Sequence, residues 1–405
     1  MIYLDAAATS PVRREVLEAM WPYLAGEFGN PSSHHAVGQS AARALAEARR
    51  TVAELLGCRP AEIVFTSGGT EADNLAVKGI ALGRMLEAVA ETGRAGRGPG
   101  ADGSRHLVVS AIEHPAVVEA VDHLARVHGF EVTVVPVGPA GLVDPEEFAA
   151  ALRPATALAS VMLANNEIGT VQPVAELAAR AASAGVPLHT DAVQAGGWLD
   201  TRLDVLGVDA LTLAGHKLGA PKGVGVLAAR QRLRLEPLVH GGGQERGRRS
   251  GTENVAFAVG FATAFRLAEA ARAEAAARVA ALRDAFITEV LHRVPGALLT
   301  GPAVGDRLAD GTDARLPSVA SFCFPGTSGE AVLLQLEERG VIVSSGSACA
   351  AGEDDPSPTL LALGLAPEVA QTAVRFTFGP TVTRDDLMAA AAALDAAVTE
   401  LARLR

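Results

Sequence analysis

The segment Ile63-Val64-Phe65-Thr66-Ser67-Gly68-Gly69-Thr70-Glu71 joins a short, apolar, β-rich run to a glycine-containing turn and the start of a helix-like stretch. The same alternation continues downstream, with further strand-like runs at residues 107–110, 131–137, 158–163, 188–191, 210–213 and 224–228. Short strands separated by helix-length segments predict a mostly parallel sheet with helices on its faces. The sequence therefore predicts an α/β fold.

Polar residues follow several of these strand-like runs closely. They are Thr70, His114, Asn166, Asp191 and Lys217. In parallel sheets the chemistry collects beyond the carboxyl ends of the strands. We therefore expect these side chains to share one cleft.

The C-terminal third of the chain differs in pattern. Residues 264–291 are rich in Ala with interleaved Arg and Glu, which predicts one long helix. Beyond it, strand-like runs at 318–324, 342–343 and 372–378 indicate a second domain. We predict a large domain at 15–258 and a smaller α+β domain built from 1–14 and 259–405. Residues 91–104, rich in Gly and Arg, are predicted to be a surface insertion.

Composition excludes several classes of function. The net charge of −11 over 405 residues gives no basic footprint for direct binding of nucleic acid. Three cysteines are too few for a disulfide framework and fit a reducing, cytoplasmic environment. No apolar run reaches the ~18 residues of a membrane span, and no secretory signal is expected. No two cysteines lie close together, so we predict no metal site.

Lys217 and Asp191 suggest an aldehyde cofactor. Lys217, in Ala214-Gly215-His216-Lys217, follows an apolar run. Desolvation would favour the neutral, nucleophilic amine that forms a Schiff base, although a surface lysine at a strand end is the common alternative. Asp191 ends a run expected to be buried, so its carboxylate needs a cationic partner, such as the ring nitrogen of pyridoxal phosphate. Gln194 is then placed to bond the phenolic oxygen.

Two further features fit the same cofactor. Ser67-Gly68-Gly69-Thr70-Glu71-Ala72-Asp73-Asn74 lies between a strand and a helix and could seat a phosphate, or could be an ordinary helix start. His216 could add a donor to that phosphate. His114 stands where a strand gives way to a helix and could stack on the cofactor and move protons, although a lone histidine is more often structural.

Cys349 ends the run Ser344-Ser345-Gly346-Ser347-Ala348-Cys349, in which every other residue is small. Such residues lose little side-chain entropy when the segment moves. Cys323 alternates within an apolar run and is expected to be buried, and Cys58 is expected to be structural. A Schiff-base lysine and a mobile thiol in one chain together suggest removal of sulfur from an amino acid.

With these residues assembled, the chain resembles the cysteine desulfurases, pyridoxal-phosphate enzymes of the class V aminotransferase family. The resemblance implies fold type I, with a mostly parallel mixed sheet flanked by helices in the large domain. The Ser-Ser-Gly-Ser-Ala-Cys form resembles the first desulfurase group, which has the longer catalytic loop. The matching motifs run nearly end to end: Tyr3-Leu4-Asp5-Ala6-Ala7-Ala8-Thr9, Gly29-Asn30-Pro31-Ser32-Ser33, residues 66–74, Glu113-His114, Asn165-Asn166-Glu167-Ile168-Gly169, Asp191 with Gln194, Gly215-His216-Lys217, residues 241–247 and 249–252, residues 344–349, and Arg375-Phe376.

The resemblance implies a set of cofactor contacts. Lys217 would hold pyridoxal phosphate covalently and then act as acid and base, His114 would stack on the ring, and Asp191 would pair with the ring nitrogen. The other implied contacts are Asn166 and Gln194 at the phenolic oxygen, and Gly69, Thr70, His216 and Thr252 at the phosphate. Thr252 would come from the second subunit of a homodimer. Ala214 stands where the family usually has a serine, and one missing hydrogen bond should weaken cofactor binding by ~0.5–1.5 kcal/mol.

The resemblance also implies the reaction. Arg375, helped by Asn166, would clamp the carboxylate of L-cysteine. Cys349 would take the sulfur as a persulfide, release L-alanine, and pass the sulfur to an acceptor protein, an iron–sulfur scaffold or a thiolation enzyme. Selenocysteine lyase, or another class V enzyme, is the alternative within the family. A noncatalytic sulfur-relay partner is the alternative outside catalysis.

Overall fold

The computed structural model describes residues 1–92, 104–345 and 355–403, and its centre is a seven-stranded sheet. The strand order is β2-β8-β7-β6-β5-β3-β4. Only β8 runs antiparallel to its neighbours, β2 and β7, and all other pairs in this sheet are parallel. The strands are β2 (Ile63–Thr66), β3 (His106–Ser110), β4 (Glu131–Val135), β5 (Thr156–Ser160), β6 (Leu188–Asp191), β7 (Ala210–Ala214) and β8 (Gly225–Ala229).

Both faces of this sheet are buried, because successive side chains of a strand point to opposite faces. In β3, Val108 packs into one core while Leu107 and Val109 pack into the other. In β8, Leu227 lies on the face opposite to that of Val226. Strands covered on both faces are apolar throughout, which explains why their sequences read as continuous apolar runs.

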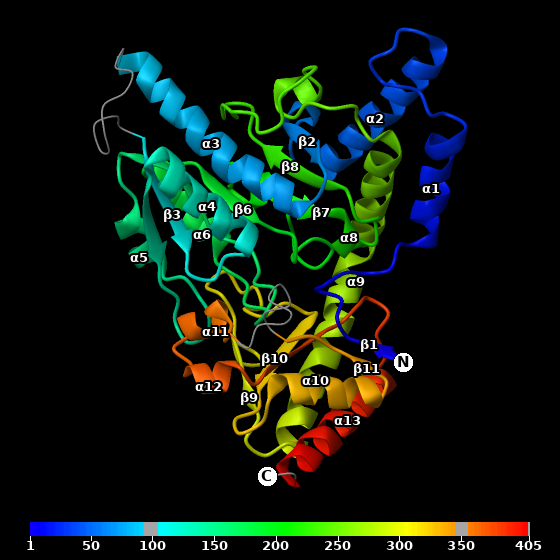
Figure 1. Ribbon diagram of the computed structural model, residues 1–405, viewed down its shortest axis with the longest axis vertical. Coiled ribbons are helices and arrows are strands. Elements are labelled where there is room, and N and C mark those ends of the chain that lie inside the picture. Colours follow the sequence, from blue (N-terminus) through cyan, green and yellow to red (C-terminus); the bar gives the residue numbers. More distant parts are fainter. Residues whose placement is uncertain (93–103, 346–354, 404–405) are drawn as a thin grey trace.

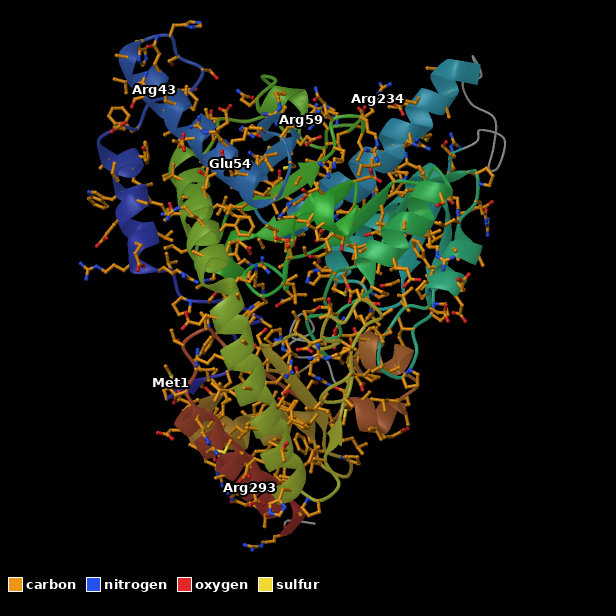
Figure 2. The ribbon with its side chains drawn as sticks, turned by 180° about the vertical axis from the view of Figure 1, so that it is seen from behind. Met1, Arg43, Glu54, Arg59, Arg234 and Arg293 are labelled. Carbon is orange, nitrogen blue, oxygen red and sulfur yellow. The ribbon has the colours of Figure 1, made fainter. Side chains whose placement is uncertain are left out.

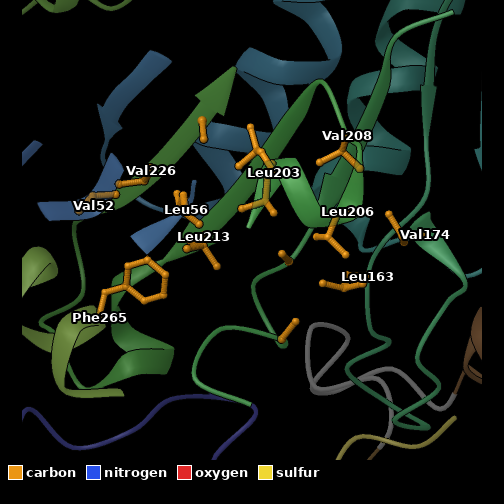
Figure 3. Close-up of a cluster of buried hydrophobic side chains, with 14 of the residues drawn as sticks. Val52, Leu56, Leu163, Val174, Leu203, Leu206, Val208, Leu213, Val226 and Phe265 are labelled. Carbon is orange, nitrogen blue, oxygen red and sulfur yellow. The ribbon is translucent and has the colours of Figure 1, made fainter. Parts of the chain in front are cut away.

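Helices cover each face (Figure 1). On one face lie α3 (Gly69–Thr92) and α4 (Pro115–His128). The other face is covered by α2 (Ala36–Leu55), α5 (Pro145–Ala151), α6 (Val174–Ser183), α7 (Leu203–Leu206) and the first half of α9. Figure 3 shows side chains of α2, α7, α9 and the sheet meeting in this second core.

The helix α9 (Val255–Arg293) joins the two parts of the molecule (Figure 2). The sequence predicted it over 264–291, and the structure confirms it with further residues at each end. Its first half packs on the sheet core through Phe261 and Phe265, and its second half enters a separate core through Phe286 and Val290. Helix α1 (Arg14–Ala25) lies along its first half.

The separate core that the second half of α9 enters lies in the C-terminal part of the chain, and the N-terminal strand β1 also belongs to this part. Strand β1 (Ile2–Tyr3) pairs with β11 (Val341–Ile342), and β10 lies between β9 and β12 in an antiparallel sheet. The other elements here are β9 (Leu298–Leu299), β10 (Val319–Cys323), β12 (Ala373–Thr377), α10 (Gly329–Glu338), α11 (Pro358–Ala362), α12 (Pro367–Ala370) and α13 (Arg384–Arg403); a short helix α8 (Gly215–Leu218) follows β7 in the large sheet.

The expected α/β class with a mostly parallel mixed sheet is confirmed. Cys323 is buried in β10, as predicted. Within the described parts of the chain, no helix combines the length and apolar character needed to cross a bilayer. The division into 15–258 and 1–14 with 259–405 stays a prediction.

Phe286 is the residue on which the C-terminal core should depend most. Its ring centroid lies 5.1 Å from that of Phe376 and 5.6 Å from that of Phe378. We expect Phe286→Ala to lower the free energy of unfolding by about 3–5 kcal/mol, because it removes a buried ring and leaves a cavity. Urea unfolding measures the loss. The control is Leu334→Ala, which truncates a side chain that is 56% exposed; equal effects of the two substitutions would contradict the prediction.

Candidate active site

A cavity of about 360 Å³ opens beyond the carboxyl ends of β3, β5, β6 and β7. It brings together every cofactor and substrate residue expected from the sequence except Thr252. Its lining residues are Ala7, Ala8, Gly69, Thr70, Asp73, His114, Met162, Asn166, Asp191, Val193, Gln194, Ala214, His216, Lys217 and Arg375. A larger and more open cavity, of about 570 Å³, lies between Arg59 and Arg230 and contains none of the expected site residues.

One end of the cavity is built for an anion. Helix α3 begins at Gly69, so the amides of Gly69 and Thr70 belong to its first turn, where N–H groups have no intrahelical acceptor. Strand β8 packs closely against the preceding turn: a Cβ on Gly225 would lie 2.4 Å from the carbonyl carbon of Gly68. His216 lines the same cavity, and burial lowers its pKa to about 4, so it is neutral at neutral pH.

The cavity also holds a buried carboxylate. Asp191 is the last residue of β6, is 5% exposed, and accepts a hydrogen bond from the amide of Val193 at 2.9 Å. Burial raises its pKa, while the nearby His114 and Lys217 lower it. A carboxylate in this position is stabilised by a ligand that offers it a cationic N–H group.

The amine of Lys217 is held against the N-terminal segment. Its Nζ donates to the carbonyl oxygens of Ala7 and Ala8, the latter at 2.7 Å. Gln194 donates to the Ala7 carbonyl as well, at 3.2 Å. The N-terminal segment, more than 200 residues away in the sequence, therefore holds the Lys217 amine at the cavity wall.

His114 caps α4, and this contact sets its tautomer. Its Nδ1 accepts a hydrogen bond from the amide of Ala116 at 3.1 Å. Burial lowers the pKa of His114, so the ring is favoured in its neutral form, with the proton on Nε2. The neighbouring Glu113 is buried, and its Oε1 accepts from Ser110 Oγ at 2.5 Å and from the Met162 amide at 2.8 Å.

At the opposite side, Arg375 of β12 points its guanidinium into the cavity. Its side chain is only 2% exposed, its Nη2 lies 2.9 Å from Asp5 Oδ1, and its Nη1 donates to the Asn166 carbonyl at 3.1 Å. Its Nε is buried and has no partner among the residues that the structure describes. A guanidinium placed in this way fits a small carboxylate ligand.

One expected site residue, Thr252, is not at this cavity: it is exposed, after β8, and does not line the cavity of its own chain. Another, Cys349, lies outside the described residues. Its upstream flank is described, and Ser344 pairs with Arg375 through backbone hydrogen bonds.

The structure adds residues that sequence reasoning did not single out. Asp73 is buried on α3, and its Oδ1 has no hydrogen-bond partner among the described residues. The side-chain atoms of Asp73, His114 and Asp191 that could bind a metal ion lie within 4.8 Å of one another. The spacing of these residues in the sequence does not predict this cluster. Because all three line the cavity beside Lys217, we assign the cluster to the cofactor pocket and not to a metal centre.

The geometry and burial of these residues fit pyridoxal phosphate. First-turn amides of α3 suit a phosphate, buried Asp191 suits a protonated ring nitrogen, and Lys217 suits the aldehyde. The side chain of Ala214, the last residue of β7, supplies no hydroxyl to the phosphate.

Comparison with known proteins gives consistent matches. The model of the family "Aminotransferase class-V" matches residues 2–389. The chain is 42% identical to the cysteine desulfurase IscS of Dictyoglomus turgidum, over 95% of this chain and 91% of that protein. It is also 42% identical to an IscS-like cysteine desulfurase of Mycobacterium tuberculosis, over 100% and 98%. Among solved structures, a NifS-like protein aligns with a TM-score of 0.85 at 33% identity, covering 99% of this chain and 100% of that one.

Glu113 should make stability depend on pH. Burial raises the pKa of Glu113 from about 4.5 to about 8. The folded carboxyl therefore binds its proton more tightly than the unfolded one, so stability falls as pH rises through this window, by at most about 1.4 kcal/mol per pH unit. We expect Glu113→Gln, which cannot ionise, to lose this dependence and to gain stability relative to wild type at the alkaline end.

Urea unfolding at about pH 5 and about pH 8.5 measures both slopes. Glu368→Gln, an exchange at an exposed carboxyl, is the control and should keep the wild-type slope. The same slope in wild type and Glu113→Gln would show that Glu113 does not hold a proton in this window.

Proposed function

The chain belongs to the class-V aminotransferase family, among the pyridoxal-phosphate-dependent cysteine desulfurases, and from this premise we propose the roles of its residues. The observation that carries the proposal is the convergence of Lys217, Asp191, His114 and Arg375 on one cavity. Asp191 ends β6, His114 and Lys217 follow β3 and β7, and Arg375 lies within β12 of the C-terminal part. Together they suit an amino-acid substrate bound to an aldehyde cofactor.

We propose which residues of the cavity bind each part of the cofactor. We assign the phosphate to the amides of Gly69 and Thr70, with neutral His216 as an additional donor. Asp191 holds the ring nitrogen in its protonated form. Asn166 and Gln194 face the phenolic oxygen, and Gln194 keeps a second amide hydrogen beyond the one given to Ala7.

Pyridoxal phosphate, when bound, withdraws electrons from the substrate α-carbon and so makes the sulfur of cysteine open to attack by a thiolate. Arg375 fixes the substrate carboxylate. Lys217 Nζ would move the proton of the substrate α-carbon, and His114 Nε2, which carries a hydrogen, would donate a proton.

Cys349 is the proposed nucleophile. Its thiolate forms an S–S bond to the substrate sulfur while the substrate C–S bond breaks, and the electron pair of that bond stays with carbon. Protonation of that carbon gives L-alanine, and the sulfur remains on Cys349 as a persulfide. We further propose that the protein is cytoplasmic and passes this sulfur to an acceptor protein, for iron–sulfur cluster assembly or for thiolation of tRNA or a cofactor.

We also propose a homodimer. Thr252 is exposed and lies away from the cavity of its own chain, which suits a contact with the phosphate site of a second copy. An exposed apolar stripe on and after α1 offers an interface, since a second copy would remove it from water. The stripe consists of Leu17, Trp21, Leu24 and Phe28, which are 54%, 68%, 54% and 72% exposed.

Substitution of Cys349 tests the nucleophile. We expect Cys349→Ala to lose production of alanine and sulfide from L-cysteine, because nothing takes the sulfur. The absorption band of the bound cofactor should persist, because none of its proposed contacts is changed. Mass spectrometry of the wild type after one turnover should find one added sulfur on Cys349. Undiminished turnover in Cys349→Ala would refute the assignment.

Trp21→Glu tests the dimer. A charge in the middle of the apolar stripe should shift wild-type dimer toward monomer in sedimentation velocity, because burying an unpaired carboxylate is costly. Leu334→Glu, at a site of 56% exposure on α10, is the control and should leave the mass unchanged. If Trp21→Glu sediments like the wild type, this stripe is not the interface.

A further inference from the structure

Glu167 links the two parts of the molecule beside the cavity. It lies next to Asn166 in the loop after β5, and its side chain contacts the residues at the start of α11. Its Oε2 accepts from Ser357 Oγ at 2.5 Å, and its Oε1 accepts from Thr359 Oγ1 at 3.1 Å. Ser357 and Thr359 are both buried, at 3% and 5% exposure. A single carboxylate therefore holds two hydroxyl groups of the C-terminal part.

Ser357 uses both functions of its hydroxyl. Its hydrogen goes to Glu167, while its oxygen accepts from the amide of Leu360 at 3.3 Å and caps α11. An ionised carboxylate only accepts hydrogen bonds, so it suits two hydroxyl donors at once. Glu167 is half-buried, and burial raises its pKa, while the hydrogen bonds from Ser357 and Thr359 and the nearby Arg375 act in the opposite direction.

The same corner of the cavity anchors the other flank of the thiol-bearing segment. Ser344 accepts a backbone hydrogen bond from Arg375 at 2.8 Å, and Arg375 Nη1 in turn donates to the carbonyl of Asn166. In the sequence, Cys349 falls five residues after Ser344 and eight before Ser357. Both described flanks of Cys349 thus connect to Asn166 and Glu167, one through Arg375 and one through the Glu167 carboxylate.

We propose that Glu167 is a positioning residue for sulfur transfer: its two hydrogen bonds hold the downstream flank of the Cys349 segment against the loop that carries Asn166. The inference rests on the proposed role of Cys349 as the nucleophile. Glu167 does not line the cavity, so it acts through Ser357 and Thr359 and not by touching the substrate. The hydrogen bonds of Arg375 to Asp5 and to the Asn166 carbonyl do not use the Glu167 side chain, so they remain when this link is cut.

The test compares Glu167→Ala, Glu167→Gln, Ser357→Ala and the Glu167→Ala/Ser357→Ala double variant in the cofactor-loaded protein. Displacement of a reacting group by about 1 Å costs up to ~10²-fold in rate, so we expect Glu167→Ala to lower kcat for alanine formation by about tenfold or more. The KM for L-cysteine and the absorption band of the bound cofactor should stay unchanged. Persulfide formation on Cys349 in a single turnover, followed by mass spectrometry, should slow by the same factor.

The double variant and the amide variant identify the hydrogen bonds. Because Glu167 and Ser357 share one hydrogen bond, the double variant should lose less than the product of the two single losses. Glu167→Gln keeps an acceptor oxygen and should recover most of the lost kcat. The matched control is Ser328→Ala, which removes a serine cap with the same 3.3 Å geometry at α10 but no contact with Glu167; its kcat should equal that of the wild type.

Several results would overturn the inference: wild-type kcat in Glu167→Ala, multiplied losses in the double variant, equal losses in the Ala and Gln variants, or a loss of KM and cofactor band together with kcat. Cys349→Ala runs in the same assays. Turnover in that variant overturns both this inference and the proposed nucleophile. An inactive Cys349→Ala beside a fully active Glu167→Ala overturns the positioning role of Glu167 alone.

Discussion

Strands β3, β5, β6 and β7 run in the same direction, and their shared direction places every polar strand-end residue on one edge of the sheet. Parallel neighbours cannot be joined by tight turns, so β3, β5 and β6 are each followed by a crossover that starts at this edge. His114, Asn166 and Asp191 stand where those crossovers begin, and Lys217 follows β7 before the chain turns back into the antiparallel β8. The position of the cavity is thus a consequence of strand direction. The helices that pack on both faces of the sheet hold the strands in place.

The sheet alone does not complete the site. The carbonyls of Ala7 and Ala8 receive the Lys217 amine, and Asp5 binds Arg375, so the first ten residues of the chain form part of the cavity. Arg375 comes from β12, in the other part of the molecule. Since α9 packs into both cores, it connects the part that carries Lys217 with the part that carries Arg375, the proposed substrate clamp.

Electrostatics explain why the cavity needs its ligand. Asp73, Glu113 and Asp191 are buried carboxyl groups near one another, and burial raises the pKa of each. Removing charge from water is costly without a partner. In the proposed arrangement, a protonated ring nitrogen beside Asp191 would relieve that cost, and the cofactor would then stabilise the residues that bind it.

The sequence by itself determined the α/β class, the strand-like runs and the residue types at their ends, because apolar periodicity and turn residues are local properties. It also marked Lys217, Asp191 and Cys349, since their motifs are short and contiguous. Only the tertiary structure decided the reversed direction of β8, the burial of Asp73, and the contact of Glu167 with Ser357 and Thr359. These features depend on pairings between segments up to 192 residues apart, and no local pattern encodes which distant group a side chain will meet.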